Sequence, residues 1–182
     1  MENRRIHITG ASGAGATTLG RALADALALP HHDTDDYFWA PTVPPYRTLR
    51  DPAERLRLMH EMFVPRVDWI LSGGLDPWGD ELIPLLDLVV FLRTPHEVRM
   101  QRLRVREARH FGAEAIGPGG WRHQETEEFI DWASRYEAGD REGRNLARQE
   151  AWLARLPCPV LRFDGSRPLS ELVTTVCAAL DR

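Results

Sequence analysis

A glycine-rich segment near the start of the chain constrains the fold more than any other feature of the sequence. It reads Gly-Ala-Ser-Gly-Ala-Gly-Ala-Thr, and it joins the apolar segment Arg5–Thr9 to Thr17–Leu29, where leucines recur four residues apart. The first pattern predicts a strand and the second predicts one face of a helix. Glycines let successive backbone N–H groups turn towards one point, and the helix start adds its positive dipole end there. The segment therefore predicts a strand–loop–helix unit that binds an anion.

Length and composition bound what surrounds this unit. The chain has 182 residues, of which 43% are hydrophobic and 27% charged, and this predicts one soluble globular domain over residues 1–182. The longest apolar run, Leu88–Leu92, is too short to cross a membrane, and the net charge of −4 gives no general attraction to nucleic acid. Two cysteines without a CxxC motif suit a reducing compartment. We therefore expect a cytoplasmic protein without a membrane or nucleic-acid partner.

Strand-like and helix-like segments alternate along the rest of the chain. Further strands are predicted at Leu29–Asp35, Trp69–Leu71, Leu88–Leu92 and Val160–Asp164. Helices are predicted to begin at Asp51–Pro52, at a capping box spanning Thr94–Glu97, and at Pro168. This alternation predicts an α/β fold in which helices cover both faces of a parallel five-stranded sheet. Arg162 within the last strand places that strand at an edge.

Ligands of such sheets bind where the strands end. Residues that follow the predicted strands should therefore meet although the sequence separates them widely. These are Gly10–Gly15, Asp33–Asp36, Ser72–Asp80, Arg93 and Asp164–Arg167.

The glycine-rich segment matches the phosphate-loop spacing G-x-x-x-x-G-K-[ST] except at Ala16, where lysine is expected. Thr17 would supply a hydroxyl to Mg²⁺. A strand-to-helix turn without any ligand is the alternative. The predicted nucleotide-binding residues are Gly10, Ser12, Gly13, Ala14, Gly15, Ala16, Thr17 and Thr18.

Because Ala16 stands where lysine is expected, the positive charge of that lysine must come from another residue. The chain contains no lysine, so any replacement is an arginine. Arg93, at the end of the neighbouring strand, is the first candidate, because its guanidinium could point at the loop. The alternatives are Arg102, Arg106 and Arg109, which form one helical stripe, and Arg141 and Arg144. Each is equally compatible with a solvated side chain or a local ion pair.

The order of these motifs resembles the small P-loop kinases of the nucleoside-monophosphate kinase and shikimate kinase group, and within it the adenylate-kinase-like ATPases. The residues that carry the resemblance are the glycine loop, Asp33-Thr34-Asp35, Ser72-Gly73-Gly74 and the arginine-rich run after the fourth strand. The resemblance implies a three-layer αβα fold with strand order 2-3-1-4-5, and Mg²⁺ and ATP on the loop. It also implies an acceptor-side flap and helix over residues 36–66, and an arginine-rich helical lid over about 106–145.

Carried over by position, Asp33 resembles the acid that helps hold hydrated Mg²⁺, and Asp35 the acid that contacts an acceptor hydroxyl. Asp36 resembles the base of uridine-kinase-like enzymes in a competing alignment; we favour Asp35. A solvated turn or helix cap is the alternative for all of these acids. Arg93 and Arg106 are expected to act in catalysis, and Asp36, Tyr37, Gly73 and Gly74 to contact the substrate.

Two functions follow from this resemblance. The first is an ATP-dependent phosphotransferase acting on a metabolite-sized acceptor, as a monomer or homodimer. The second is a nucleotide-binding sensor or regulatory ATPase of the same fold with little or no transfer. The two functions differ in whether an arginine occupies the space that the lysine side chain would fill.

Overall fold

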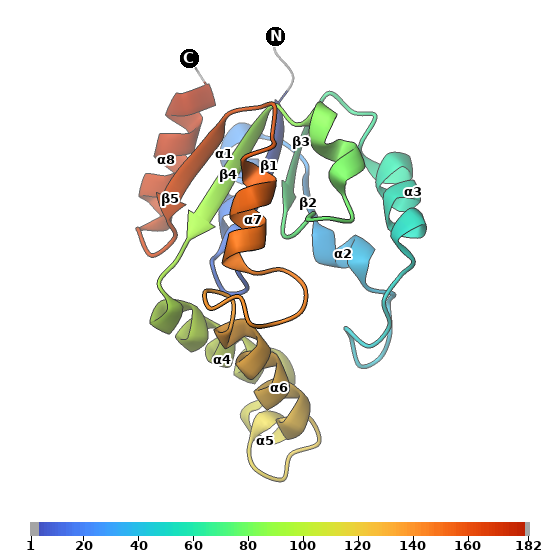
Figure 1. Ribbon diagram of the computed structural model, residues 1–182, viewed down its shortest axis with the longest axis vertical. Helices are drawn as coiled ribbons and strands as arrows, with labels where there is room; N and C mark the ends of the chain where they lie inside the picture. The colour runs from blue at the N-terminus through green and yellow to red at the C-terminus, as the bar shows by residue number, and fades with distance from the viewer. Residues whose placement is uncertain (1–3, 181–182) are drawn as a thin grey trace.

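The computed structural model describes residues 4–180 and contains one parallel sheet of five strands in the order β2-β3-β1-β4-β5 (Figure 1). The strands are β1 (Arg4–Gly10), β2 (His31–Asp33), β3 (Asp68–Ser72), β4 (Leu88–Arg93) and β5 (Val160–Asp164). This is the expected order, and β5 is an edge strand as Arg162 indicated. All strands end at the same side of the sheet, which we call the carboxyl edge.

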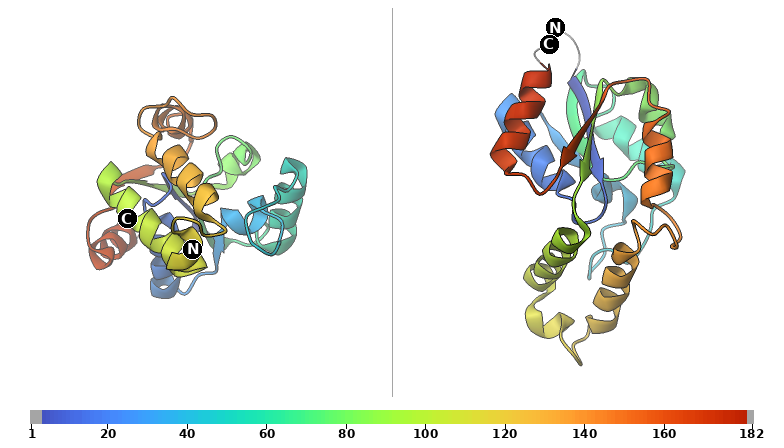
Figure 2. Two further views of the ribbon diagram at one scale, coloured as in Figure 1. Left: turned by 90° about the horizontal axis from the view of Figure 1, so that it is seen from below. Right: turned by 60° about the vertical axis from the view of Figure 1, so that its left-hand side comes forward.

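Helices cover both faces of the sheet, so the fold has the three layers that the sequence predicted (Figures 1 and 2). On one face lie α1 (Ala16–Leu27) and α8 (Leu169–Leu180). On the other lie α3 (Pro52–Met62), the short 3₁₀ helix η1 (Asp80–Leu85) and α7 (Leu146–Leu153). The five-residue helix α2 (Thr34–Phe38) follows β2 directly.

Alternation along the strands fills the two cores. Ile6, Ile8, Ile70 and Val90 point towards Leu19, Leu23, Leu172 and Val176 of α1 and α8. Their neighbours in the strands point the other way, towards Met59, Phe63, Leu82 and Trp152. Full burial of one such side chain contributes roughly 1.5–3 kcal/mol, so these clusters hold the carboxyl edge in place.

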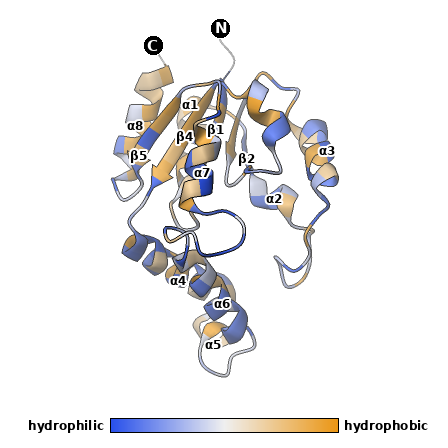
Figure 3. Ribbon diagram, viewed as in Figure 1, coloured by the Kyte–Doolittle hydropathy of each residue, from blue (hydrophilic) through white to orange (hydrophobic). Residues whose placement is uncertain are grey.

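Three further helices project beyond the carboxyl edge: α4 (His96–Phe111), α5 (Ala113–Ile116) and α6 (His123–Ser134) (Figure 2). Their small core consists of Met100, Leu103, Ile130 and Ala133, and α4 and α6 carry more hydrophilic residues than the strands do (Figure 3). None of the helices within residues 4–180 has the length and apolarity needed to span a membrane.

Two local predictions were wrong. The strand predicted at Leu29–Asp35 is shorter, because the Asp33 side chain accepts the Asp35 N–H and caps α2. The capping box predicted from Thr94 does not form, because the Thr94 hydroxyl donates to the Ala14 carbonyl at 3.0 Å instead. The start of α3 is as predicted, since Asp51 caps the helix and Pro52 is its first residue.

Candidate functional site

The glycine loop between β1 and α1 is shaped by contacts that only glycine permits. Gly13 and Gly15 have φ angles of 81° and 102°, which strain any side-chain-bearing residue. A Cβ at Gly10 would lie 2.6 Å from the Leu92 carbonyl oxygen, and one at Gly13 would lie 2.8 Å from the Arg99 carbonyl oxygen. The loop is therefore clamped between the end of β4 and the first turns of α4.

A hydrogen-bonded group of side chains lies beside this loop. The Thr17 hydroxyl donates to Asp33 Oδ2 at 2.7 Å, and the Ser72 hydroxyl donates to the same oxygen at 3.3 Å. Ser72 Oγ in turn lies 2.9 Å from His31 Nε2. Three separate segments, the start of α1 and the ends of β2 and β3, therefore fix the orientation of one carboxylate.

The Thr17 and Asp33 oxygens fit a magnesium ion. Within residues 4–180, no group of three or more His, Cys, Asp or Glu side chains is arranged to hold a metal ion by itself. Mg²⁺ usually takes only one or two protein oxygens and completes its shell with water and substrate phosphates. A hydroxyl and a carboxylate next to an anion-binding loop are a donor set of that kind.

Asp35 lies one residue beyond the start of α2 and remains accessible to water. Partial desolvation of the carboxyl and the negative charge of Asp33 raise the pKa of Asp35 to about 6, although the guanidinium groups of Arg144 and Arg106 act in the opposite direction. The same carboxyl thus faces both a repelling acid and attracting arginines, which is a common arrangement at catalytic sites.

Asp36 is in a different environment. Desolvation raises the pKa of its carboxyl, and the charges that oppose this effect come from His31 and Arg21 rather than from Arg144 and Arg106. The Asp35 carboxyl is therefore influenced by Arg144 and Arg106, and the Asp36 carboxyl by Arg21.

Arg144 comes from the loop between α6 and α7 and lies against the end of β3. A Cβ on Gly74 would collide with its guanidinium group, so the glycine makes room for this side chain. Gly73, with a φ of 116°, makes room for Thr34 in the same way, and the Thr34 hydroxyl accepts the Gly74 N–H at 3.0 Å. Burial lowers the pKa of Arg144, whereas Tyr136, Asp35 and Asp76 raise it.

Within residues 4–180, the Arg144 guanidinium makes no ion pair and no side-chain hydrogen bond, although the Asp35 and Asp76 carboxyls are near enough to raise its pKa. The nearby Asp76 carboxyl is also enclosed, and its Oδ2 lies 3.7 Å from Arg148 Nε. Burial raises the pKa of Asp76. The guanidinium of Arg144 is thus a positive charge at the carboxyl edge that is available to an anion.

The arginines considered as replacements for the lysine lie at different places. Arg102 Nη1 donates to the Ala14 and Gly165 carbonyls at 3.3 and 3.0 Å, beside the loop. The Arg106 side chain is exposed, 3.4 Å from Glu107 Oε1, and near Asp35. The Arg93 side chain is exposed and makes no hydrogen bond or ion pair with any residue between 4 and 180. Its predicted role remains a prediction.

Tyr37 is placed where it does not support the predicted substrate contact. Its ring is buried in the core against Phe63, and its hydroxyl lies 2.9 Å from His32 Nδ1. Sequence reasoning assigned it to the acceptor because it directly follows the acids, but α2 turns that position towards the sheet.

Sequence reasoning missed Arg99 and His31, and it placed Ser72 at this edge of the sheet without giving it a role. Arg99 is fully buried and donates from Nη1 to the Ser12 carbonyl of the glycine loop at 3.0 Å. One signal was present in the sequence, because Arg99 lies four residues before the buried Leu103 and therefore shares its face of the helix.

Searches for relatives give one close curated match. No family model matches the chain. The uncharacterized protein YqaC of Bacillus subtilis (strain 168) is 40% identical over 173 residues, which cover 95% of each chain. The chain belongs to the YqaC family. In this member of the YqaC family, the match spans the glycine loop, the acids and the arginine-bearing helices alike.

Solved structures place this YqaC-family chain in a known fold. A gluconokinase from Sinorhizobium meliloti 1021 superposes with a TM-score of 0.55 and 21% identity, covering 99% of this chain and 93% of that one. A shikimate kinase from Bacteroides thetaiotaomicron gives a TM-score of 0.54 and 22% identity, covering 98% and 99%. The chain has the P-loop kinase fold.

Proposed function

We propose that this chain is a magnesium- and ATP-dependent phosphotransferase that acts on a small molecule. The observation that carries the proposal is the 2.7 Å contact between the Thr17 hydroxyl and the Asp33 carboxylate, directly beside a loop of anion-binding geometry. Its structural neighbours include a gluconokinase and two shikimate kinases, which are small-molecule kinases of the same fold. The two cysteines, Cys158 and Cys177, are free thiols, which fits a cytoplasmic protein.

The residues divide into a donor side and an acceptor side. On the donor side, the backbone N–H groups of residues 10–18 bind phosphate oxygens, and Thr17 and Asp33 hold the metal. When bound, Mg²⁺ neutralises phosphate charge. On the acceptor side, Asp35 orients a hydroxyl group and takes its proton. The hydroxyl oxygen then bonds to the γ-phosphorus, the bond from that phosphorus to the β–γ bridging oxygen breaks, and ADP leaves.

In this proposal, Arg144 indicates that the acceptor is negatively charged. A guanidinium that is enclosed by protein and lacks a carboxylate partner is expected to bind a carboxylate or phosphate, because both match its planar donors. Gly74 leaves room for that guanidinium beside Asp35. The proposed acceptor is therefore a small hydroxylated molecule that also carries a negative group.

The arginine-bearing segments complete the proposal. Arg106 is near enough to Asp35 to lower the pKa of its carboxyl, and we propose that it stabilises the transferring phosphoryl group in place of the missing lysine; Arg93 remains an alternative. Residues 36–66 would form the acceptor-side flap and helix, and residues 106–145 the lid. Ala16 favours a second candidate function, a nucleotide sensor of the same fold, since it removes a charge-assisted phosphate contact worth about 1.5–3 kcal/mol.

An ADP-release assay distinguishes the two functions. Mg-ATP is supplied with a panel of hydroxylated carboxylates, sugar phosphates, nucleosides and uncharged polyols. The proposal predicts that one of the anionic acceptors stimulates ADP release and that Arg144→Met raises its KM by about tenfold or more, the usual effect of a lost charge-assisted contact. Nucleotide binding without stimulation by any acceptor favours the sensor. Stimulation by an uncharged polyol with no effect of Arg144→Met contradicts the anionic acceptor.

A further inference from the structure

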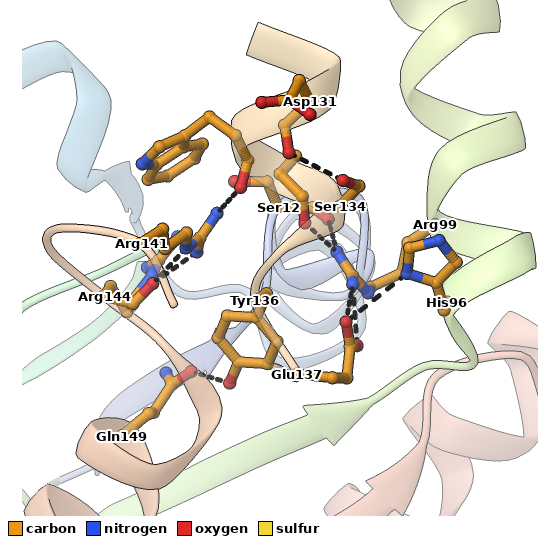
Figure 4. A network of polar contacts seen from close by, with 12 residues as sticks. Ser12, His96, Arg99, Asp131, Ser134, Tyr136, Glu137, Arg141, Arg144 and Gln149 are labelled. Atoms are coloured by element: carbon orange, nitrogen blue, oxygen red, sulfur yellow. Dashed lines mark hydrogen bonds and ion pairs between the residues drawn. The ribbon is translucent and has the colours of Figure 1, made fainter. Parts of the chain in front are cut away.

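Arg99 connects the glycine loop to the segment that returns from the projecting helices. Its side chain is fully buried, and besides the Ser12 carbonyl it contacts Glu137, with Nη2 at 2.7 and 2.6 Å from the two carboxylate oxygens. Nη1 also donates to the Ala133 carbonyl at the end of α6, at 3.4 Å. Figure 4 shows the guanidinium between Ser12 and Glu137. One side chain therefore joins the loop, α4 and the end of α6.

The residue before Glu137 makes a second connection to the same strand and loop. Tyr136 is buried, and its hydroxyl donates to Gln149 Oε1 at 2.5 Å. Gln149 Nε2 donates to the Thr9 hydroxyl at 2.8 Å, one residue before the glycine loop begins. Tyr136 is thus connected to Thr9 through Gln149, and Glu137 is connected to Ser12 through Arg99.

The contacts continue from the end of α6 to Arg144. Arg141 Nη1 donates to the Trp132 carbonyl at 2.5 Å, and its guanidinium carbon lies 3.7 Å from the centre of the Trp132 ring. Arg141 Nε also donates to the Arg144 carbonyl at 2.8 Å, and Nη2 donates to the same oxygen. The backbone that presents Arg144 is therefore fixed to the same helix end that Arg99 contacts (Figure 4).

We propose that Arg99 and Glu137 are positioning residues that couple the nucleotide site to the acceptor site, so that nucleotide bound at the glycine loop orders residues 137–145 and thereby places Arg144. The proposal rests on the proposed function, because it needs a nucleotide at the loop. Its physical basis is that the two terminal nitrogens of one rigid, planar guanidinium are held at once, Nη2 by the Glu137 carboxylate and Nη1 by the Ser12 carbonyl. When bound phosphate fixes the conformation of the loop, it also fixes the Ser12 carbonyl. Arg99, which donates to that carbonyl, is then fixed as well, and so is Glu137, which Arg99 contacts.

Only the arginine of this pair is buried, whereas the Glu137 side chain is 37% exposed. A shift of Glu137 away from Arg99 would leave the buried guanidinium charge without its carboxylate partner, which is costly. Ordering of the glycine loop therefore favours ordering of residues 137–145. The nucleotide site and the acceptor site are in this way linked by a coupling free energy.

Hydrogen exchange with Mg-ADP as the ligand tests the coupling. In the wild-type protein, Mg-ADP is expected to slow amide exchange at residues 10–18 and, by about fivefold or more, at residues 137–145, the lower end of usual coupling factors. In Glu137→Gln, exchange at residues 10–18 still slows, but exchange at 137–145 no longer responds. The readout is the response to nucleotide, which a purely structural role in the ligand-free protein does not change.

Matched variants keep the test decisive. Arg104→Met removes an exposed arginine of the same helix and is expected to respond like the wild type. Arg99→Met tests the other partner, and Glu137→Gln carries the test if Arg99→Met does not fold. A response at 137–145 that persists in Glu137→Gln, or that is absent from the wild type while 10–18 responds, overturns the coupling. No response at 10–18 in the wild type overturns the proposed function itself.

Discussion

At the residue scale, the account depends on single oxygens and single charges. Thr17 Oγ1 and Asp33 Oδ2 lie within hydrogen-bond distance of each other, and both oxygens would contribute to binding a metal ion. Thr17→Ala is therefore expected to lower the affinity for Mg-ADP by about tenfold or more, since even outer-shell changes at metal sites cost roughly 10–100-fold. Calorimetric titration with and without Mg²⁺ measures this.

The control for Thr17→Ala is Thr174→Ala, which removes an exposed hydroxyl that contacts only the Ser170 carbonyl of its own helix α8. It should leave the affinity unchanged. An unchanged affinity in Thr17→Ala as well, with the magnesium effect intact, would remove Thr17 from the metal site.

Asp35 gives the account its pH dependence. A carboxyl with a pKa of about 6 is charged above that pH and protonated below it, so transfer should rise as the pH increases through about 6 and level off above it. Asp35→Asn should lower kcat by roughly 10²–10⁴-fold and abolish this dependence. Carboxyl-carbon NMR of the wild type measures the titration directly; a midpoint near 4 contradicts the environment described for Asp35.

The chemistry of single residues was only partly predictable from the sequence. The order of residue types predicted the meeting of Thr17 and Asp33, because both follow elements whose ends lie at the carboxyl edge. Arg99 was not predicted, since an arginine within a helix is usually solvated, and its burial depends on Glu137, which lies 38 residues further on. Tyr37 was misplaced because helix α2 was not foreseen.

At the element scale, the segment between α2 and α3 reaches the projecting helices. Arg47 Nη1 lies 2.5 Å from Glu125 Oε1, and the Tyr46 ring centre lies 6.2 Å from that of His110. These contacts join residues 39–50 to α4 and α6. The flap and lid of the proposed function therefore touch in this structure.

Loss of the Arg47–Glu125 pair should loosen the flap without unfolding the protein. Both side chains are about one-third or more exposed, so Arg47→Ala should change stability by only about 0.2–1 kcal/mol and Tm by less than about 4 °C. Hydrogen exchange at residues 40–50 should nevertheless become faster, while Arg57→Ala on α3, which removes an exposed local pair, should not affect it. Unchanged exchange in Arg47→Ala contradicts a flap held by this contact.

Elements with strong periodicity were predicted well, and those that depend on distant contacts were not. The leucines of α1 and the Asp51–Pro52 start of α3 were sufficient, because these signals are local. Thr94 misled the prediction of the α4 start, since its hydroxyl donates to the Ala14 carbonyl of the glycine loop. Helix α7 was missed because its buried face is not a plain apolar stripe. Gln149 and Trp152 lie on that face and make hydrogen bonds to Thr9 and Asp80.

At the scale of the whole molecule, the carboxyl edge gathers the glycine loop, the acids after β2, the glycines after β3 and the arginines of the projecting helices. Strand order followed from the resemblance to P-loop kinases and not from periodicity, because periodicity does not specify which strands are neighbours. A ligand that bridges these elements should stabilise all of them together, since it would bind only when they are all in place at the edge of the one sheet.

Mg-ADP should accordingly raise the melting temperature of the whole chain. At a concentration of about 100 times Kd, binding contributes about 2.7 kcal/mol, or roughly 5–10 °C for a chain of this size. Thr17→Ala should show little of this shift at the same concentration. A wild-type Tm that does not move with nucleotide contradicts the assignment of the loop.

Phosphorus NMR of Mg-ATP mixed with the acceptor that best stimulates ADP release tests the central claim most directly. The account predicts a new phosphate-ester signal that grows in step with ADP in the wild type, and no such signal with Asp35→Asn. Release of inorganic phosphate alone, or the same ester signal in Asp35→Asn, would contradict a phosphotransferase in which Asp35 receives the acceptor proton.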